Sequence, residues 1–374
     1  MSGVTNRMNE YTQLTCQGKI GILLHRPRFG SSCSYFSGRS CVLDIEPFCG
    51  IRYNLDRITD PSLVITPPYD VISPVEQQFY YRRSPYNVVR LELGEELPPD
   101  SPQDNKYTRA DSTLKSWLKD GILIRDKQPS FYIFQHRFSH RGVLRNRWGL
   151  TARVMIQDWS TGNIRPHEVT FREYTTDRLN LLQACRVNLS PVFGIIRNKD
   201  GSFHSLLSEL AAGKPVLSAE DNYGETHSMW IVNGETELAR IHRFCTDRTL
   251  YIADGHHRYE TALAYQKEQR TACTSSTGNE AFNFAMMTLT DWSDPGLLIL
   301  PSHRLIKFPA EYNYNAGELE ERLKVVFHME ELLRCSSAPA GAVEEWMNAL
   351  EERGGMALGL YGLRGENLLI LVPQ

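Results

Sequence analysis

The sequence has no long hydrophobic run and no closely spaced pair of cysteines. No stretch approaches the roughly 18 apolar residues of a membrane-spanning helix, so no membrane association is expected. Eight cysteines occur, but none lies in a C-x-x-C pair, which argues against a ribbon-type zinc site. The first twenty residues contain no apolar core of signal-peptide length. We therefore expect a cytoplasmic protein with reduced thiols.

The sequence also lacks an excess of charge of either sign. The formal net charge is −3, so a broad nucleic-acid surface is not favoured, although a local basic pocket is compatible with this value. Hydrophobic residues make up 41% of the chain, which excludes a fibrous or wholly disordered protein. The length of 374 residues indicates two or three domains.

Short apolar runs alternate with helical patterns along most of the chain, which predicts a mixed α/β (α+β) fold. We expect a disordered tail over 1–42, an N-terminal α/β region over 43–150, a central α/β region over 151–308, and a C-terminal α/β region over 309–374. The clearest helix signal follows Ser73, with Pro74 at the first position and Glu76 closing a capping box. We expect strands at 63–65, 88–93, 192–196 and 297–300, and a basic, turn-rich segment at 136–148. The arginine cluster at 137–147 is expected to be a solvated face rather than a nucleic-acid site.

The segment Asp254-Gly255-His256-His257-Arg258 is the most informative motif. It follows a short apolar run and precedes a helical pattern, so the loop lies at a helix N-terminus. Unpaired N–H groups there attract anions, glycine permits close approach, and the basic side chains add donors. The motif predicts a phosphate site. A helix cap with solvated histidines and a metal site are the alternatives, although adjacent loop histidines rarely converge on one ion.

Five other segments place polar side chains where ligands are often bound. His167 and Glu168 follow a proline, and a partly buried Glu168 is a candidate general base; a surface carboxylate is the alternative. Arg178 is a candidate partner for a phosphate or carboxylate group. Asn188 is a candidate turn residue or a residue that binds a ligand. Further candidates follow apolar runs, at Tyr69 and Asp70 and again at His303 and Arg304. For each of these, a purely structural role remains open.

Together these motifs resemble an uncharacterised prokaryotic family, the domain of unknown function 1015. The resemblance covers about 45–308 and is carried by five segments: 67–72, 167–170, 177–179, 188–191 and 253–262. Asp294-Pro295-Gly296 and the segment 299–304 also match the family pattern. Relative to that pattern, we expect 309–374 to be a shortened C-terminal region.

A more distant resemblance connects Pro166-His167-Glu168 and the Asp-Gly-His-His-Arg loop to free-serine kinases of the ParB/sulfiredoxin superfamily. It implies a ParB/sulfiredoxin-like core over 151–308, with Glu168 as the base and His257 as a second catalytic residue. It also implies that Asp254, Gly255, His256, His257 and Arg258 bind nucleotide phosphates. Mg²⁺ would lie near Asp254, with no dedicated protein metal site. Tyr69, Asp70, His167, Arg178, Asn188, His303 and Arg304 are then the candidate substrate-binding residues.

The expected function is phosphoryl transfer from ATP or ADP to a small hydroxyl substrate, with L-serine as the favoured acceptor. This chemistry requires a base for the alcohol proton and donors for the phosphoryl charge. A nucleotide-binding regulatory switch without kinase activity is the main alternative. A hydrolase or nuclease is a weaker one, because the sequence shows no cluster of metal ligands and has an acidic balance.

Overall fold

The computed structural model describes residues 23–24, 43–166, 172–198, 200–246, 248–273, 277–300, 305–306, 315–334, 339–353 and 357–374. The chain divides into two compact units, Met1–Pro301 and Ser302–Gln374. Within 1–42, only β1 (Leu23–Leu24) is described, and it pairs with β3 (Gly50–Tyr53). The mixed α/β class is confirmed.

The first unit is built on a large mixed sheet. Its described strands follow the order β7-β11-β8-β12-β6-β5-β10-β9, and β2 also pairs with β6. Their bounds are β2 Ile45–Glu46, β5 Phe131–His140, β6 Val143–Met155, β7 Ile164–Arg165, β8 Val192–Ile196, β9 Leu217–Glu220, β10 Thr226–Val232, β11 Leu250–Asp254 and β12 Phe284–Asp291. A smaller sheet joins β1, β3 and β4 (Leu123–Arg125).

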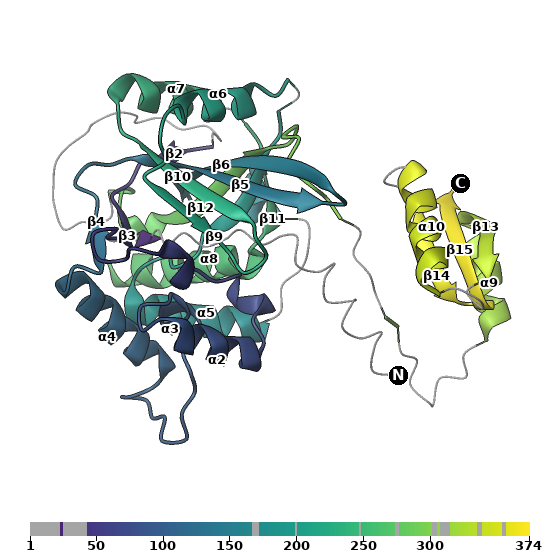
Figure 1. Cartoon of the computed structure of the whole chain (residues 1–374), viewed down its shortest axis with the longest axis horizontal. Coiled ribbons are helices and arrows are strands. Elements are labelled where there is room, and N and C mark those ends of the chain that lie inside the picture. The colour runs from purple at the N-terminus through teal and green to yellow at the C-terminus, as the bar shows by residue number, and fades with distance from the viewer. Residues whose placement is uncertain are drawn as a thin grey trace. The chain divides into compact units, whose positions relative to one another are not determined.

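Helices border the large sheet. Their bounds are α2 Pro74–Arg83, α3 Val89–Glu92, α4 Lys106–Lys119, α5 Arg172–Cys185, α6 Ser202–Leu210, α7 Glu235–Cys245 and α8 His256–Ala272, with short 3₁₀ turns η1 Pro61–Leu63, η2 Tyr69–Val71, η3 Trp159–Thr161 and η4 Ala281–Asn283. In Figure 1, α6 and α7 lie along one margin of this unit, and α2 to α5 with α8 lie along the opposite margin.

Alternate residues of the central strands enter different hydrophobic clusters, as the strand period of two requires. Ile133 and Leu150 belong to a cluster that includes residues of α6, α7 and α8. Their neighbour Tyr132 instead joins a cluster with Phe48 and Ile65. The second sheet packs with α4 and the end of α5 in a third cluster. Large buried clusters on this scale are the main source of stability.

Three predicted strands were wrong. The predicted strand 63–65 begins inside η1, where Asp60 accepts a hydrogen bond from the Ser62 N–H at 3.0 Å. The predicted strand 88–93 is mostly α3, whose Val89 N–H donates to the Asn87 side chain at 3.0 Å. No regular element is assigned to 297–300. In the first two cases, a local hydrogen bond from a main-chain N–H to an Asp or Asn side chain favours a helical turn over the β propensity of a short apolar run.

The prediction for 136–148 was also wrong, since this segment is not turn-rich but forms most of the β5–β6 hairpin. Its tip, Arg141-Gly142, has φ angles of 50° and 75°, the positive values that a tight hairpin turn needs. Its arginines are also not all solvated, since Arg147 is 6% exposed. By contrast, the capping box of Ser73 and Glu76 at the start of α2 is confirmed.

The second unit is a small sheet with two described helices. Its elements are α9 Ala316–Lys324, β13 Phe327–Arg334, α10 Pro339–Glu352, β14 Leu358–Gly362 and β15 Gly365–Pro373. The strands run antiparallel in the order β13-β15-β14, and the Trp346 indole donates to the Leu369 carbonyl at 3.0 Å. Across the described residues of both units, no helix is long and apolar enough to cross a membrane.

Candidate functional site

The junction between β11 and α8 places the Asp-Gly-His-His-Arg segment at the end of a sheet strand. The ladder with β8 is irregular between Ile252 and Asp254, and Asp254 lies opposite Phe193. Gly255 precedes α8 with a φ of 89°, and as a glycine it has no side chain with which to cap the helix. The N-terminus of a 17-residue helix is a favourable place for an anion because its main-chain N–H groups point outward along the helix axis.

Arg258 lies in the first turn of α8 and stabilises the junction between β11 and α8. Its guanidinium donates to the Asp254 carboxylate and to the Pro191 carbonyl. A Cβ added at Gly255 would lie 2.9 Å from that guanidinium, so the glycine permits the close approach. Burial opposes the charge, but the negative charge of Asp254, with smaller contributions from Tyr69 and Asp70, raises the pKa of Arg258. The arginine therefore stays charged.

A second arginine, Arg178, contacts η2 near this junction. The Arg178 guanidinium lies 3.9 Å from the centroid of the Tyr69 ring, and it also donates to the Glu92 carbonyl at 2.9 Å. Burial raises the pKa of Tyr69 to about 12, although the charges of Arg178 and Arg258 act in the opposite direction. Tyr69 thus lies within electrostatic reach of both arginines and carries a proton at neutral pH.

Asp177 fixes the position of Arg178. Its carboxylate accepts hydrogen bonds from Arg178 at 2.9 Å and from the Tyr107 hydroxyl at 2.9 Å, and pairs with Lys106 at 2.8 Å. Burial works against ionisation, but Arg178 and Lys106 outweigh it and lower the pKa of Asp177 to about 2. This carboxylate therefore orients Arg178 from the side of α4 and α5.

Asp177→Asn is expected to lower the free energy of unfolding by about 2 kcal/mol at pH 7. The folded pKa of about 2 lies below the ordinary value of 3.8, so this contribution is complete above about pH 5. It is lost as the pH falls from about 4 to about 2. Urea unfolding between pH 2 and pH 7 measures it. Asp56→Asn, at an exposed position, is the control, and equal pH profiles for the two variants would contradict the assignment.

Of the other predicted site residues, some are described by the structure and some lie outside the described residues. His256 is 1% exposed and His257 is half-buried at the start of α8. The Asn188 side chain accepts a hydrogen bond from the Met286 N–H at 3.4 Å, which ties it to β12. Glu168, the predicted base, lies outside the described residues. The same holds for three predicted substrate-binding residues: His167, His303 and Arg304.

The Asp294-Pro295-Gly296 segment forms a structural corner. The buried Asp294 carboxylate accepts hydrogen bonds from the Gly296 N–H at 2.7 Å and the Trp148 N–H at 3.1 Å. Its contact with the Nδ1 of His204, at 2.9 Å, connects α6. A Cβ on Gly296 would lie only 2.2 Å from the Asn146 carbonyl oxygen. This segment therefore holds β6 in place through main-chain contacts.

A polar group on β5, β6 and β10 was not predicted from the sequence. His136, Arg147, Glu225 and His227 meet there although up to 91 residues separate them. Burial and the nearby Arg147 and His227 lower the pKa of His136 to about 2, so His136 is neutral. Burial and Asp221 raise the pKa of Glu225. Only the strand pairing, in which His136 lies opposite His227, reveals this group.

Comparison with known proteins gives one positive result. A family model described as "Protein of unknown function (DUF1015)" matches residues 45–370 and so covers most of both units. No curated protein matches the sequence, and no solved structure matches it.

Proposed function

The chain belongs to the DUF1015 family, whose function is unknown, and we propose that it transfers a phosphoryl group from a nucleotide to a small hydroxyl substrate. Free serine is the favoured acceptor, and ATP or ADP the donor. One observation carries the proposal: at the N-terminus of α8, the Arg258 guanidinium pairs with the Asp254 carboxylate beside Gly255. Arg258 also acts electrostatically on Tyr69, and Arg178 stacks on the ring of Tyr69.

The residues at this junction fit the phosphates of a nucleotide. Gly255 allows the phosphate to approach the first N–H groups of α8, and Arg258 adds a charged donor. The carboxylates of Asp70, Glu92 and Asp254 also act on Arg258, so a bare phosphate would meet negative charge. A Mg²⁺ ion held by one or two carboxylates and by phosphate oxygens removes this conflict. Asp254 and Asp70 are the proposed ligands.

Strand pairing supports a place for Glu168 in the same site. β7 runs parallel to β11, with Ile164 opposite Leu250 and Arg165 opposite Tyr251. Glu168 and Asp254 each follow the second of these pairs by three residues, a reach of at most about 10 Å. The length of chain after the paired residues therefore allows Glu168 to reach Asp254, despite the 86 positions between them in the sequence. Glu168 would take the proton of the acceptor hydroxyl as the hydroxyl attacks phosphorus.

The ParB/sulfiredoxin-like core belongs to the same proposal. Its support is the arrangement of β7, β11, β8 and β12 as neighbouring strands, with α5 following β7 and α8 following β11. Both motifs of the kinase resemblance then lie at the ends of adjacent strands. Ligands are often bound at strand ends in α/β proteins.

Phosphorus NMR of the full chain with Mg²⁺, L-serine and either ATP or ADP tests the proposal. We expect a phosphoserine signal for the wild type and a rate at least about 100-fold lower for Glu168→Gln, because general base catalysis contributes this much. Glu235→Gln, on the exposed start of α7, is the matched control and should keep the wild-type rate.

Two outcomes would contradict the proposed transfer. Equal turnover by wild type and Glu168→Gln would remove Glu168 as the base. Broadened nucleotide resonances without phosphoserine would instead identify a nucleotide-binding module that performs no transfer, the alternative raised by the superfamily resemblance.

A further inference from the structure

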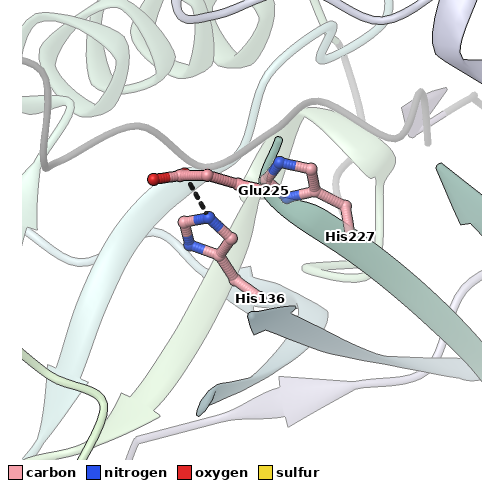
Figure 2. A group of neighbouring side chains, drawn as sticks. All are labelled: His136, Glu225 and His227. Carbon is pink, nitrogen blue, oxygen red and sulfur yellow. Dashed lines mark hydrogen bonds and ion pairs between the residues drawn. The ribbon is translucent and has the colours of Figure 1, made fainter. Parts of the chain in front are cut away.

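We propose that His136, Glu225 and His227 bind a divalent transition-metal ion of the Zn²⁺ class. Each residue offers one ligand atom, and these atoms lie within 4.8 Å of one another; no other such group occurs among the described residues. Figure 2 shows the three side chains turned toward one another from β5 and from the start of β10. The site is independent of the proposed phosphoryl transfer.

The fold assembles the three ligands by strand pairing. His136 on β5 lies directly opposite His227 on β10. Glu225 precedes His227 by two residues, and positions two apart point to the same face of an extended chain. Its Oε2 lies 2.7 Å from Nε2 of His136. Two imidazoles and a carboxylate from adjacent chain segments form a common ligand set for Zn²⁺.

Asp221 supplies the outer partner that metal-binding histidines usually have. Its Oδ2 lies 3.0 Å from Nε2 of His227, and the carboxylate is held by the N–H groups of Tyr223 at 2.9 Å and Glu225 at 3.0 Å. With Nε2 facing Asp221, Nδ1 is the ring atom of His227 that can act as a ligand to an ion. A carboxylate that orients a ligand histidine in this way is typical of zinc sites.

The charge balance also favours a cation. Asp221 and Glu225 contribute two carboxylates to this group, whereas Arg147 contributes one guanidinium. His227 is 3% exposed, His136 is 9% exposed and Arg147 is 6% exposed, so water screens this imbalance poorly. An ion would also tie the 221–225 turn to β5.

Metal binding requires defined side-chain movements. Arg147 donates to Nδ1 of His136 at 3.1 Å, so the ring proton is on Nε2 and points to Glu225. An ion at Nε2 takes the place of that proton, which moves to Nδ1, and Arg147 must leave Nδ1. The His136 and His227 rings are inclined by only 13°, so one must turn for both lone pairs to meet one ion. A tetrahedral site also draws the ligand atoms to about 3.3 Å apart.

Arg147 can withdraw without losing all its contacts. Its guanidinium lies 5.2 Å from the Phe193 ring centroid and 6.0 Å from that of Phe138. These rings offer it an alternative environment through cation–π interactions. Arg147 thus competes with the metal, and its replacement should strengthen binding.

Titration of the metal-free full chain with ZnSO₄, followed by calorimetry and by thermal unfolding, tests the proposal. We expect one ion per chain and a higher melting temperature with metal. His227→Ala should abolish both, Asp221→Asn should weaken binding 10- to 100-fold, and Arg147→Met should strengthen it. His242→Ala, on the exposed side of α7, is the matched control and should bind as the wild type does.

Two further measurements test the identity of the ligands. Co²⁺ should give a spectrum without a thiolate charge-transfer band, because the ligand set contains no cysteine. Glu225→Gln keeps the shape of the side chain, and it provides a second test if His227→Ala fails to fold. Equal Zn²⁺ binding by wild type, His227→Ala and Glu225→Gln would overturn the proposal. So would the absence of stoichiometric binding by the wild type.

Discussion

Arg258→Met is expected to lower the free energy of unfolding by about 3 kcal/mol and to weaken nucleotide binding 10- to 100-fold. The stability loss arises because Asp254 loses its cationic partner and the Pro191 carbonyl loses its donor. Both side chains are largely removed from water, at 13% exposed for Arg258 and 31% for Asp254. The binding loss arises because Arg258 is the proposed donor to phosphate at the start of α8.

A double variant tests whether the loss of nucleotide binding follows from the loss of stability. Asp254→Asn together with Arg258→Met removes both charges, so most of the lost stability should return while the nucleotide affinity remains low. Arg243→Met, at an exposed position on α7, should change neither quantity. Urea unfolding and calorimetric titration with a nucleotide and Mg²⁺ provide the measurements. If the stable double variant bound nucleotide normally, Arg258 would have a purely structural role.

Gly296→Ala is expected to destabilise the first unit by about 3 kcal/mol or more. The added Cβ would lie 2.2 Å from the Asn146 carbonyl oxygen and 2.6 Å from the Arg147 nitrogen. Both contacts are with main-chain atoms of β6, which cannot move aside as a flexible side chain would. The corner held by Asp294 would have to open. The melting temperature and the urea midpoint should both fall.

Gly341→Ala is the comparison for this prediction. Gly341 lies in α10, and a Cβ there meets no described atom within 4 Å. Alanine should therefore stabilise that helix by about 0.5 to 1 kcal/mol through its better helix propensity. Comparable stability losses at Gly296 and Gly341 would show that the close approach at Gly296 does not matter.

The sequence predicted those helices and strands whose sequence pattern lies within one helical turn or one short strand. The Ser73 capping box starts α2, and the apolar run 192–196 is β8. The Asp-Gly-His-His-Arg motif was correctly placed between a strand and a helix, because Gly255 and the flanking patterns act locally. The strand predicted at 88–93 was wrong, because propensity does not show the hydrogen bond from the Val89 N–H to the Asn87 side chain at the start of the helical turn.

Tertiary structure alone decided which side chains meet. Arg178 stacks on Tyr69, although the two residues are 109 positions apart in the sequence. The tertiary structure also brings Tyr69 and Asp70 close enough to act electrostatically on Arg258, which is paired with Asp254. The His136 group depends on the register between β5 and β10, and a shift by one residue would turn every side chain to the other face. Local patterns thus determined the fold class and the β11–α8 junction. The long-range pairing of strands determined the composition of both sites.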